Sequence, residues 1–410
     1  MPHRDRLVRR STAFLSGAQV ALWGAIGVFA AFGVLASSEL SGLHGAAAIL
    51  FGLYYLSAAA GARIAGRFMD RRGRRPGLVA GYAVLAVSGV VAFAATRSGS
   101  FGLLLASGVI LGMGAGAALL GRAAVADMYP PQERGRAVGR LVVAGTVGAV
   151  GGPPLGSAVN SLAERLTGIG LAFPWLLVTV LALAAMALVG AVRPDPRDLA
   201  VGPTGAVGAR RVPRVILQLR PAAVAVVAVG IGQAVMVTFM SVVPVLVREH
   251  GAAPLTVSVV VSIHLAGMFA LSQPIGVVLD RWGRRAGLLG GALTSVAGVA
   301  LGLASTSTPV ATVGLFLIGV GWSAAYLGST AVVSDLSAPS ERAGALGLTD
   351  LIAAISAAIG VFGGAALLEG PGFTVLSVVA LGLLAAPVAL LVPLREPSRM
   401  AASGEGAPEG

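Results

Sequence analysis

Long apolar runs alternate with short polar segments along the whole chain. A membrane helix needs about 20 apolar residues to cross roughly 30 Å of hydrocarbon, and runs of this length recur. The first set covers Phe14 to Ala36, Gly45 to Ala65, Pro76 to Thr96, Phe101 to Ala126, Leu141 to Leu162 and Phe173 to Val192. The second set covers Ala222 to Val247, Leu255 to Leu279, Ala286 to Ser305, Pro309 to Ser334, Ala345 to Leu368 and Phe373 to Leu394. This pattern predicts an all-α membrane protein with twelve transmembrane helices, six in each set.

The longest polar segment separates the two sets of runs. It extends from Arg193 to Arg220 and contains several prolines and glycines, which is typical of a flexible linker. We therefore expect an N-terminal six-helix bundle over residues 1–192, a cytoplasmic linker over 193–220 and a C-terminal six-helix bundle over 221–394. Residues 395–410 are rich in Gly, Ala, Pro and Glu, so we expect a disordered cytoplasmic tail there.

The composition agrees with a lipid environment. Hydrophobic residues make up 56% of the 410 residues and charged residues only 11%, whereas soluble domains carry about 25% charged residues. The net charge of +12 comes from arginines in short clusters between the apolar runs. With both termini in the cytoplasm, only Arg97, Arg165 and Arg248 fall in outside loops, in keeping with the positive-inside rule. This distribution favours a multi-pass protein of the cell (inner) membrane over a nucleic-acid binder.

Two missing residue types narrow the possible chemistry. The chain contains no Cys and no Lys, so it offers no thiolate metal ligand, no Walker A lysine and no Schiff-base lysine. It has only four His and no H-E-x-x-H motif. We therefore expect no metal, no cofactor and no enzymatic activity. We also expect that ATP hydrolysis does not supply the energy for any transport. A membrane enzyme and a non-transporting sensor on the same scaffold are the rival classes.

An internal repeat relates the two sets of runs. The segment G-R-F-M-D-R-R-G-R-R at 66–75 recurs 210 residues later as G-V-V-L-D-R-W-G-R-R at 276–285. A second pattern follows the fourth and tenth runs, where Asp127, Pro131, Glu133 and Arg134 recur 208 residues later as Asp335, Pro339, Glu341 and Arg342. Parallel repeats of six spans are one way in which secondary transporters are built, with the substrate bound near the membrane midplane between the halves.

The two ten-residue segments resemble the loop 2–3 and loop 8–9 signatures of the major facilitator superfamily, and the resemblance covers nearly the whole chain. It implies two pseudo-symmetric six-helix bundles that alternate access to a central cavity. It also implies that Asp70 docks at the start of the eleventh span and Asp280 at that of the fifth, as an inner gate; anchoring of topology is the plainer role of the arginines. The gate motif residues are Gly66, Asp70, Arg71, Gly73, Arg74 and Arg75, with Gly276, Asp280, Arg281, Gly283, Arg284 and Arg285 in the second copy.

The fifth span carries a further motif with the residues Gly148, Gly152, Pro153 and Gly156. Glycines four residues apart share one helix face and allow another helix to approach closely. The motif resembles the antiporter signature G-x-x-x-G-P-x-x-G of drug exporters in the superfamily. The resemblance implies proton-coupled efflux of small, largely apolar compounds; uptake of a small metabolite, by symport or facilitated diffusion, is the alternative.

The fourth span departs from the pattern of many proton-coupled members. Those members carry an Arg in the middle of this span, four residues before a Gly. Here Gly112 fits that Gly, but the preceding position is Gly108, and Arg122 lies only about 6 Å from the cytoplasmic end of the span. This departure leaves the usual proton route of the family without its arginine.

Two ionisable residues inside the spans are candidates for proton coupling, because buried charges in a membrane are costly and usually functional. His264 lies about 14 Å into the eighth span, near the midplane. A neutral His that bonds a neighbouring helix is an equal alternative. Asp350 lies nearer the cytoplasmic edge, where we favour an ion pair with Arg71 or Arg75 over proton carriage.

Large and polar side chains at helical spacing are candidates for lining a substrate cavity. Tyr54 occupies the repeat position of His264, and the other candidates recur four residues apart or one turn apart within a span. The full set is Gln19, Trp23, Tyr54, Gln233, Met236, His264, Trp322 and Tyr326. Aromatic and Met side chains would suit a broad apolar substrate, but ordinary helix packing is the simpler explanation for any single one of them. The expected partners are a small-molecule substrate, protons and membrane lipids, and we expect a monomer.

Overall fold

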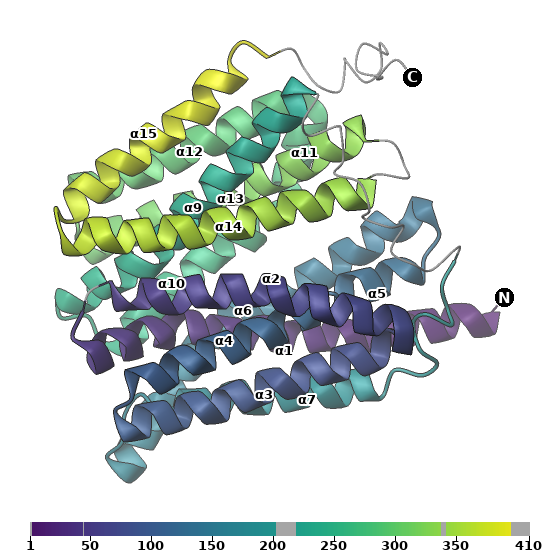
Figure 1. Cartoon of the computed structure of the whole chain (residues 1–410), viewed down its shortest axis with the longest axis horizontal. Helices are drawn as coiled ribbons and strands as arrows, with labels where there is room; N and C mark the ends of the chain where they lie inside the picture. Colours follow the sequence, from purple (N-terminus) through teal and green to yellow (C-terminus); the bar gives the residue numbers. More distant parts are fainter. Residues whose placement is uncertain (1, 44, 202–218, 338–341, 395–410) are drawn as a thin grey trace. The chain divides into compact units, whose positions relative to one another are not determined.

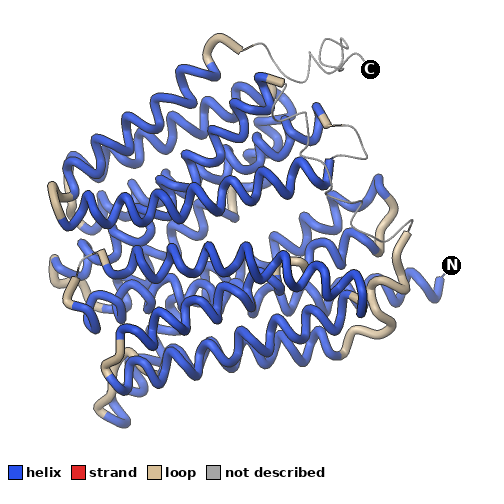
Figure 2. The backbone as a smooth tube through the Cα atoms, in the orientation of Figure 1, coloured by secondary structure: helices blue, strands red, loops and turns tan. Residues whose placement is uncertain are grey.

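The computed structural model describes residues 2–43, 45–201, 219–337 and 342–394. Within these ranges every regular element is an α-helix, drawn in blue in Figure 2, where no segment has the red of a strand. The helices of the first half are α1 (Pro2–Ser41), α2 (Ala46–Arg72), α3 (Arg74–Ser98), α4 (Phe101–Ala118), α5 (Gly121–Asp127), α6 (Pro131–Thr167) and α7 (Phe173–Gly190). Those of the second half are α9 (Arg220–Glu249), α10 (Pro254–Phe269), α11 (Ser272–Trp282), α12 (Arg284–Ala304), α13 (Thr308–Leu336), α14 (Arg342–Glu369) and α15 (Phe373–Leu391).

These helices form twelve segments that are long and apolar enough to cross a membrane, so the predicted fold class and span number are confirmed. Two segments consist of two helices each: α4 and α5 form the fourth, and α10 and α11 form the eighth. The break in the eighth segment falls between Phe269 and Ser272, where the hydroxyl of Ser272 donates to the carbonyl oxygen of Phe269 at 2.8 Å. This bond satisfies a carbonyl group that the break releases from the helical ladder.

Several helices extend beyond the apolar runs that predicted them. Helix α1 begins at Pro2 rather than near Phe14, and α6 covers Pro131–Thr167 rather than Leu141 to Leu162. A helix satisfies its own backbone hydrogen bonds in water as well as in lipid, so it need not end where the hydrocarbon ends. The arginines of the predicted N-terminal tail therefore lie on the first turns of α1.

The described residues divide into two compact units. Unit 1 contains the described residues of 1–205 and 251–262, and unit 2 those of 206–250 and 263–410. In unit 1, α1 packs against α6 and α7, and α3 packs against α4 and α7 (Figure 1). In unit 2, α9 packs against α14 and α13, and α12 packs against α13 and α15. The pairs α1–α6, α3–α4 and α3–α7 thus correspond to α9–α14, α12–α13 and α12–α15.

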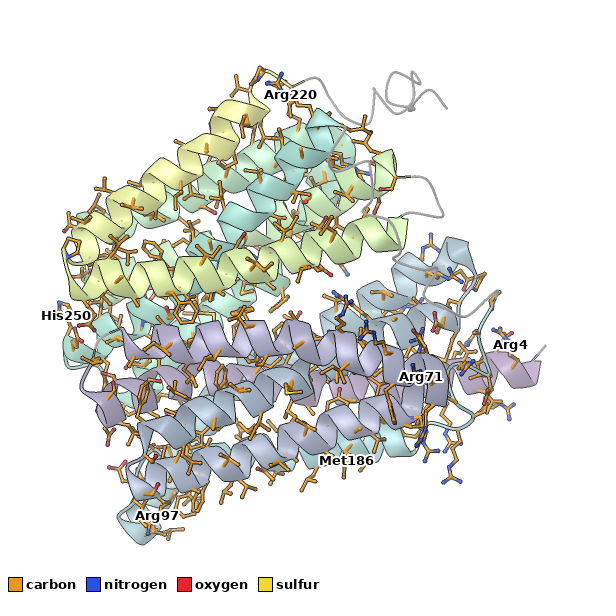
Figure 3. The ribbon with its side chains drawn as sticks, viewed as in Figure 1. Arg4, Arg71, Arg97, Met186, Arg220 and His250 are labelled. Carbon is orange, nitrogen blue, oxygen red and sulfur yellow. The ribbon has the colours of Figure 1, made fainter. Side chains whose placement is uncertain are left out.

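Each unit has two distinct ends along its helices. In unit 1, Arg4 and Arg71 lie at one end and Arg97 lies at the opposite end (Figure 3). In unit 2, Arg220 and His250 mark the two ends of α9. Arg4 and Arg71, from two segments that the sequence predicts to be cytoplasmic, thus lie at the same end of unit 1, and Arg97, from a predicted outside loop, lies at the other end.

Candidate functional site

The gate motif of unit 1 forms a charged cluster around Arg74. Gly73 joins α2 to α3 with φ +102°, a conformation that favours glycine. This turn brings Arg74, the first residue of α3, beside Asp70 in the last turn of α2. Arg74 Nε donates to Asp127 Oδ2 at 2.9 Å, and Arg74 Nη1 donates to Asp70 Oδ1 at 3.2 Å. One guanidinium group thus connects the ends of α2, α3 and α5.

The second copy of the motif builds the same cluster in unit 2. Gly283 has φ +95° and joins α11 to α12. Arg284 Nε donates to Asp335 Oδ2 at 3.2 Å, and Arg284 Nη1 donates to Asp280 Oδ1 at 2.5 Å. The two motif aspartates differ in exposure: the side chain of Asp280 is 72% exposed, whereas that of Asp70 is 35% exposed. The next residue, Arg285, donates from Nε to the carbonyl oxygen of Leu391 at 2.9 Å, at the end of α15.

Each copy of the motif therefore forms the same ion-pair cluster within its own unit. Asp127 and Asp335, which the sequence marks only as repeat partners, are the acceptors for the two motif arginines. Docking of Asp70 on the eleventh span and of Asp280 on the fifth stays a prediction. In the second repeat pattern, Pro339 and Glu341 lie outside the described residues.

Asp195 is a residue of the unit 1 cluster that the sequence reasoning missed. Its carboxylate accepts hydrogen bonds from the backbone N–H groups of Arg74 at 3.1 Å and Arg75 at 2.9 Å. An acidic side chain at a helix N-terminus satisfies free N–H groups and complements the helix dipole, so Asp195 caps α3. The signal in the sequence was Pro-Asp-Pro at 194–196, one residue after the end of the sixth apolar run.

The first part of the predicted linker is consequently fixed to unit 1 rather than flexible. The backbone N–H of Val201 donates to the carbonyl oxygen of Asp127 at 2.9 Å, and Arg4 Nη2 donates to that of Leu199 at 2.8 Å. Arg197 Nη1 donates to the carbonyl oxygen of Asp70 at 3.1 Å. Charged side chains hold this segment where composition suggested only a spacer. Residues 202–218 of the linker, and the predicted tail at 395–410, lie outside the described residues.

The glycines of the antiporter-like motif pack α6 directly against α1. A methyl group at Gly148 would overlap the carbonyl oxygen of Val20, and one at Gly152 would overlap that of Gly24. Pro153 lies on the same face, because a methyl group at Gly27 would lie 2.9 Å from its Cδ. Close backbone contact between the two helices is therefore built from these positions, as the spacing of the glycines predicted.

Unit 2 repeats this contact between α14 and α9. A methyl group at Gly360 would lie 2.7 Å from the Cβ of Ala234, and one at Gly364 would meet the side chain of Thr238. The residues opposite these glycines correspond as well: Val20 and Gly24 on α1 lie 214 residues before Ala234 and Thr238 on α9. The same spacing separates Gln19 from Gln233, so these two cavity candidates are partners in the repeat.

At the position where many family members carry an arginine, the fourth span packs Gly108 against α2. A methyl group at Gly108 would lie 2.5 Å from Cδ1 of Leu50 on α2, so the α2–α4 contact fills this position. Arg122 lies on the short helix α5, with an exposed side chain. The departure seen in the sequence is thus accommodated by packing around glycine.

His264 lies in the interior of unit 2. Its side chain is 0% exposed, and Nδ1 lies 2.7 Å from the carbonyl oxygen of Leu315 on α13. Among the described residues, its buried Nε2 atom finds no hydrogen-bond partner. Gly319 provides the space for the ring, because a methyl group there would lie 3.1 Å from Nδ1. This geometry matches the alternative in which the histidine joins two helices, and the proton-coupling role stays a prediction.

A chain of polar and aromatic groups crosses three helices of unit 2. Trp322 Nε1 on α13 donates to Oε1 of Gln233 on α9 at 2.5 Å. The rings of Trp322 and Tyr326 are stacked, with centroids 5.3 Å apart and planes at 16°. The hydroxyl of Tyr326 donates to Oδ1 of Asp350 on α14 at 3.4 Å. The structure thus brings together three cavity candidates and one proton-coupling candidate; the predicted ion pair of Asp350 with Arg71 or Arg75 stays a prediction.

Phe269 extends this cluster and was not identified from the sequence. Its ring centroid lies 6.1 Å from that of Trp322, with the two planes at 78°. Phe269 is the last residue of α10, directly before the break in the eighth segment. A single aromatic residue in an apolar run carries no signal of such a contact, because its partner belongs to another helix.

The remaining cavity candidates make contacts of their own within each unit. Gln19 is 6% exposed. Trp23 packs against Gly145 of α6, because a methyl group at Gly145 would lie 2.5 Å from Cδ1 of the indole. Tyr54 is 6% exposed and contacts the ring of Phe29 at a centroid distance of 5.2 Å. Met236 is 1% exposed and packs in the interior of unit 2. Their predicted place along a substrate cavity stays a prediction.

Comparison with known proteins identifies relatives over almost the full length. The family model described as Major Facilitator Superfamily matches residues 11–243 and 222–409. The chain is 29% identical over 406 residues to the "Uncharacterized MFS-type transporter YdeG" of Bacillus subtilis (strain 168), covering 94% of this chain and 93% of the relative. It is 27% identical over 379 residues to the "Riboflavin transporter RfnT" of Brucella anthropi, covering 89% of this chain and 90% of the relative.

Solved structures of similar fold cover the chain equally well. The D-xylose-proton symporter has a TM-score of 0.71 at 17% identity and covers 95% of this chain and 98% of its own. The human organic anion transporter MFSD10 (TETRAN) has a TM-score of 0.66 at 19% identity and covers 94% of this chain and 99% of its own. At these identities the likeness concerns the fold.

Proposed function

Because this chain belongs to the Major Facilitator Superfamily and is a multi-pass membrane transporter, we propose that it exports small, largely apolar compounds in exchange for protons. The observation that carries this proposal is the packing of Gly148, Gly152 and Pro153 of α6 directly on α1. These residues form the motif that resembles the antiporter signature of drug exporters, and their contact with α1 gives that resemblance a physical basis.

The two halves of the chain are the moving parts in this proposal. The bundles of residues 1–192 and 221–394 alternate access to a substrate site, and the chain acts as a monomer in the cell (inner) membrane with both termini in the cytoplasm. Arg74 and Arg284 hold the charged clusters at the ends of the helices, where exchange of ion pairs can accompany the movement. The absence of Lys from the sequence excludes a Walker A site, so an ion gradient supplies the energy.

Asp350 is the better candidate for carrying the proton in this scheme. A proton carrier must exchange with water, and Asp350 is partly exposed whereas His264 is fully buried. The hydrogen bond from Tyr326 also connects Asp350 to the aromatic residues that are candidates for contacting the substrate. Uptake and release of a proton at Asp350 can thereby alter the groups next to the substrate.

Transport into inside-out membrane vesicles tests the direction and the coupling. Respiration acidifies the lumen of such vesicles, so an exporter that exchanges protons accumulates its substrate inside them. We expect accumulation of a small apolar dye that disappears when a protonophore collapses the pH gradient. Vesicles without the chain provide the background. Dye movement that is unchanged after collapse of the gradient would rule out proton exchange.

The gate assignment has its own test. Asp70→Ala should abolish transport while the protein remains in the membrane, because Arg74 loses one of its two carboxylate partners at the motif turn. Asp198→Ala, which removes an exposed carboxylate in the segment after α7, is the matched control. Full transport by the Asp70 variant would remove this residue from the gate.

Movement of a metabolite, inward by symport or facilitated diffusion, is the second candidate function. The relative named "Riboflavin transporter RfnT", which aligns with most of the chain, supports a metabolite with a planar ring system as the cargo. Intact cells that accumulate a labelled metabolite only when they express the chain would favour this candidate. Accumulation in inside-out vesicles alone would favour export.

A further inference from the structure

We propose that Arg63, Arg67 and Arg71 of α2 form a binding track for organic anions, which are largely apolar molecules that carry one sulfonate, carboxylate or phosphate group. We call these three residues the arginine track. This proposal rests on the proposed function, because it adds a negative charge to the class of compound that the chain transports. The track lies within unit 1 and leads from the end marked by Arg71 toward the middle of α2 (Figure 3).

The three arginines lie on one face of α2, and all three side chains are exposed. Successive members are four residues apart, so each is turned by about 40° and shifted by about 6 Å from the one before, and the track covers about 12 Å of the helix. Arg63 lies about 14 Å before the last residue of α2, inside the apolar run that predicted this span. A charged side chain within a span is costly and usually functional.

Among the described residues, no carboxylate neutralises the arginine track. The ion pairs there belong to Arg74 and Arg284, and none of the three guanidinium groups takes part in them. The acidic residue nearest in the sequence is Asp70, three residues after Arg67, and its carboxylate accepts from Arg74 instead. The N–H groups of the track are therefore available to a ligand, and arginine holds carboxylate and phosphate groups by two parallel hydrogen bonds.

Apolar side chains beside the arginines favour an organic anion over an inorganic one. Ile64 is 57% exposed and Phe68 is 37% exposed. Each of them directly follows a residue of the track, so it points about 100° away from that arginine around the helix. A molecule that lies along this side of α2 can place its anionic group on the arginines and its apolar body on Ile64 and Phe68.

The repeat shows that neither the topology nor the gate motif requires the whole track. The spacing of 210 residues between the two copies of the motif relates the track to three residues of α11, which are in order Gln273, Val277 and Arg281. Only the last of these is cationic, although this copy forms the same turn and the same ion-pair cluster. Arg63 and Arg67 are therefore additions of unit 1, as expected of residues with a function of their own.

The length of the track favours a mobile anion over a lipid headgroup. The phosphate of a phospholipid stays in the headgroup layer, outside the hydrocarbon that the span crosses. Arg71 near the helix end can reach that layer, but Arg63 lies about 12 Å deeper along the helix. A soluble anion can instead pass from one arginine to the next, because a line of like charges attracts it over the whole length.

Equilibrium dialysis with the purified full-length chain in dodecylmaltoside micelles tests the proposal. The probe is naphthalene-1-sulfonate, and naphthalene-1-sulfonamide is a neutral counterpart of nearly the same shape. We expect the sulfonate to bind more tightly than the sulfonamide at low ionic strength. Raising the ionic strength from about 0.02 M to about 0.3 M should remove most of this preference, because salt screens the interactions of exposed charges.

Substitutions on the track separate its effect from that of the overall positive charge. Arg63→Gln and Arg67→Gln should each weaken sulfonate binding by about 2- to 5-fold, as expected for the loss of one exposed ion pair, and leave sulfonamide binding unchanged. Arg67→Lys retains the charge and should stay close to the parent. Arg97→Gln removes the same charge at the opposite end of unit 1 and should leave sulfonate binding unchanged. Elution of each variant as a monodisperse peak confirms that it is folded.

The outcomes separate this proposal from the proposed function. Equal binding of sulfonate and sulfonamide by the parent, or equal sulfonate binding by the parent and the two folded Gln variants of the track, would refute the track even if vesicles show gradient-driven export. Displacement of the sulfonate by phosphatidylglycerol, but not by phosphatidylcholine at the same mole fraction, would assign the track to lipid headgroups and overturn the proposal. Track-dependent binding without gradient-driven movement in vesicles would support the track and refute proton exchange.

Discussion

The contact between α1 and α6 predicts opposite effects for alanine at two glycines that lie three residues apart. Gly148 faces α1, and a methyl group there would overlap the carbonyl oxygen of Val20 and lie 2.8 Å from the backbone nitrogen of Gly24. Gly151 lies on an exposed face of the same helix, and a methyl group there would meet no atom within 4 Å. The two substitutions add the same group to the same helix, so only the surroundings differ.

The magnitude follows from the separation that the methyl group imposes. Ordinary contact begins at 3.4 Å, so the Gly24 nitrogen alone requires the helices to move apart by roughly 0.6 Å, and the overlap with the Val20 carbonyl oxygen requires more. A gap of this size already forfeits at least a quarter to a half of the dispersion energy of the atoms along it. Overpacking typically costs 1–3 kcal/mol, and we expect about 3 kcal/mol because both opposing groups are backbone atoms that cannot rotate away. Gly151→Ala should instead stabilise the chain by up to about 1 kcal/mol through helix propensity.

Denaturant titration of the purified variants in mixed micelles measures both free energies of unfolding. We expect a difference of about 3–4 kcal/mol between Gly148→Ala and Gly151→Ala, with opposite signs relative to the parent. Gly360 and Gly363 form an equivalent pair on α14, because a methyl group at Gly360 would lie 2.7 Å from Ala234 and one at Gly363 would meet nothing within 4 Å. A Gly148→Ala variant as stable as the parent would show that this helix contact is looser than described.

Three further predictions follow from single contacts. Arg74→Gln should lower the free energy of unfolding by about 2–3 kcal/mol, because it leaves two partly buried carboxylates without their cation. Arg284→Gln should lower it by only about 1 kcal/mol, because the side chain of Asp280 is 72% exposed. Equal losses for the two variants in the same titration would contradict this prediction. Asp195→Ala should cost about 1 kcal/mol and speed hydrogen exchange at the amide groups that it caps, while exchange at those groups in the parent stays slow. His264→Ala should cost about 1–3 kcal/mol, because it removes a buried hydrogen bond to the Leu315 carbonyl group and leaves a cavity between the helices. We expect no change in the pH profile of transport, and a shifted profile would make His264 a proton carrier.

Much of the gate cluster could be predicted from the sequence, because its residues are neighbours along the chain. Asp70 and Arg74 are four residues apart, and the glycine between them permits the turn that brings them together. The third member, Asp127, could be marked only as a repeat partner, because its contact with Arg74 joins segments 53 residues apart. Asp195 was missed for the same reason: a proline-rich polar segment reads as a spacer until the helix end that it caps is known.

The sequence by itself determined the number of spans, the two-fold repeat and the glycine face of α6. These properties depend on the length of apolar runs and on helical periodicity, which act within one segment at a time. The tertiary structure alone decided that Gln233, Trp322, Tyr326 and Asp350 form one connected chain, and that His264 points into a helix contact. Such contacts depend on how far each helix is rotated about its own axis, and small residues on the neighbouring helices set that rotation through close packing.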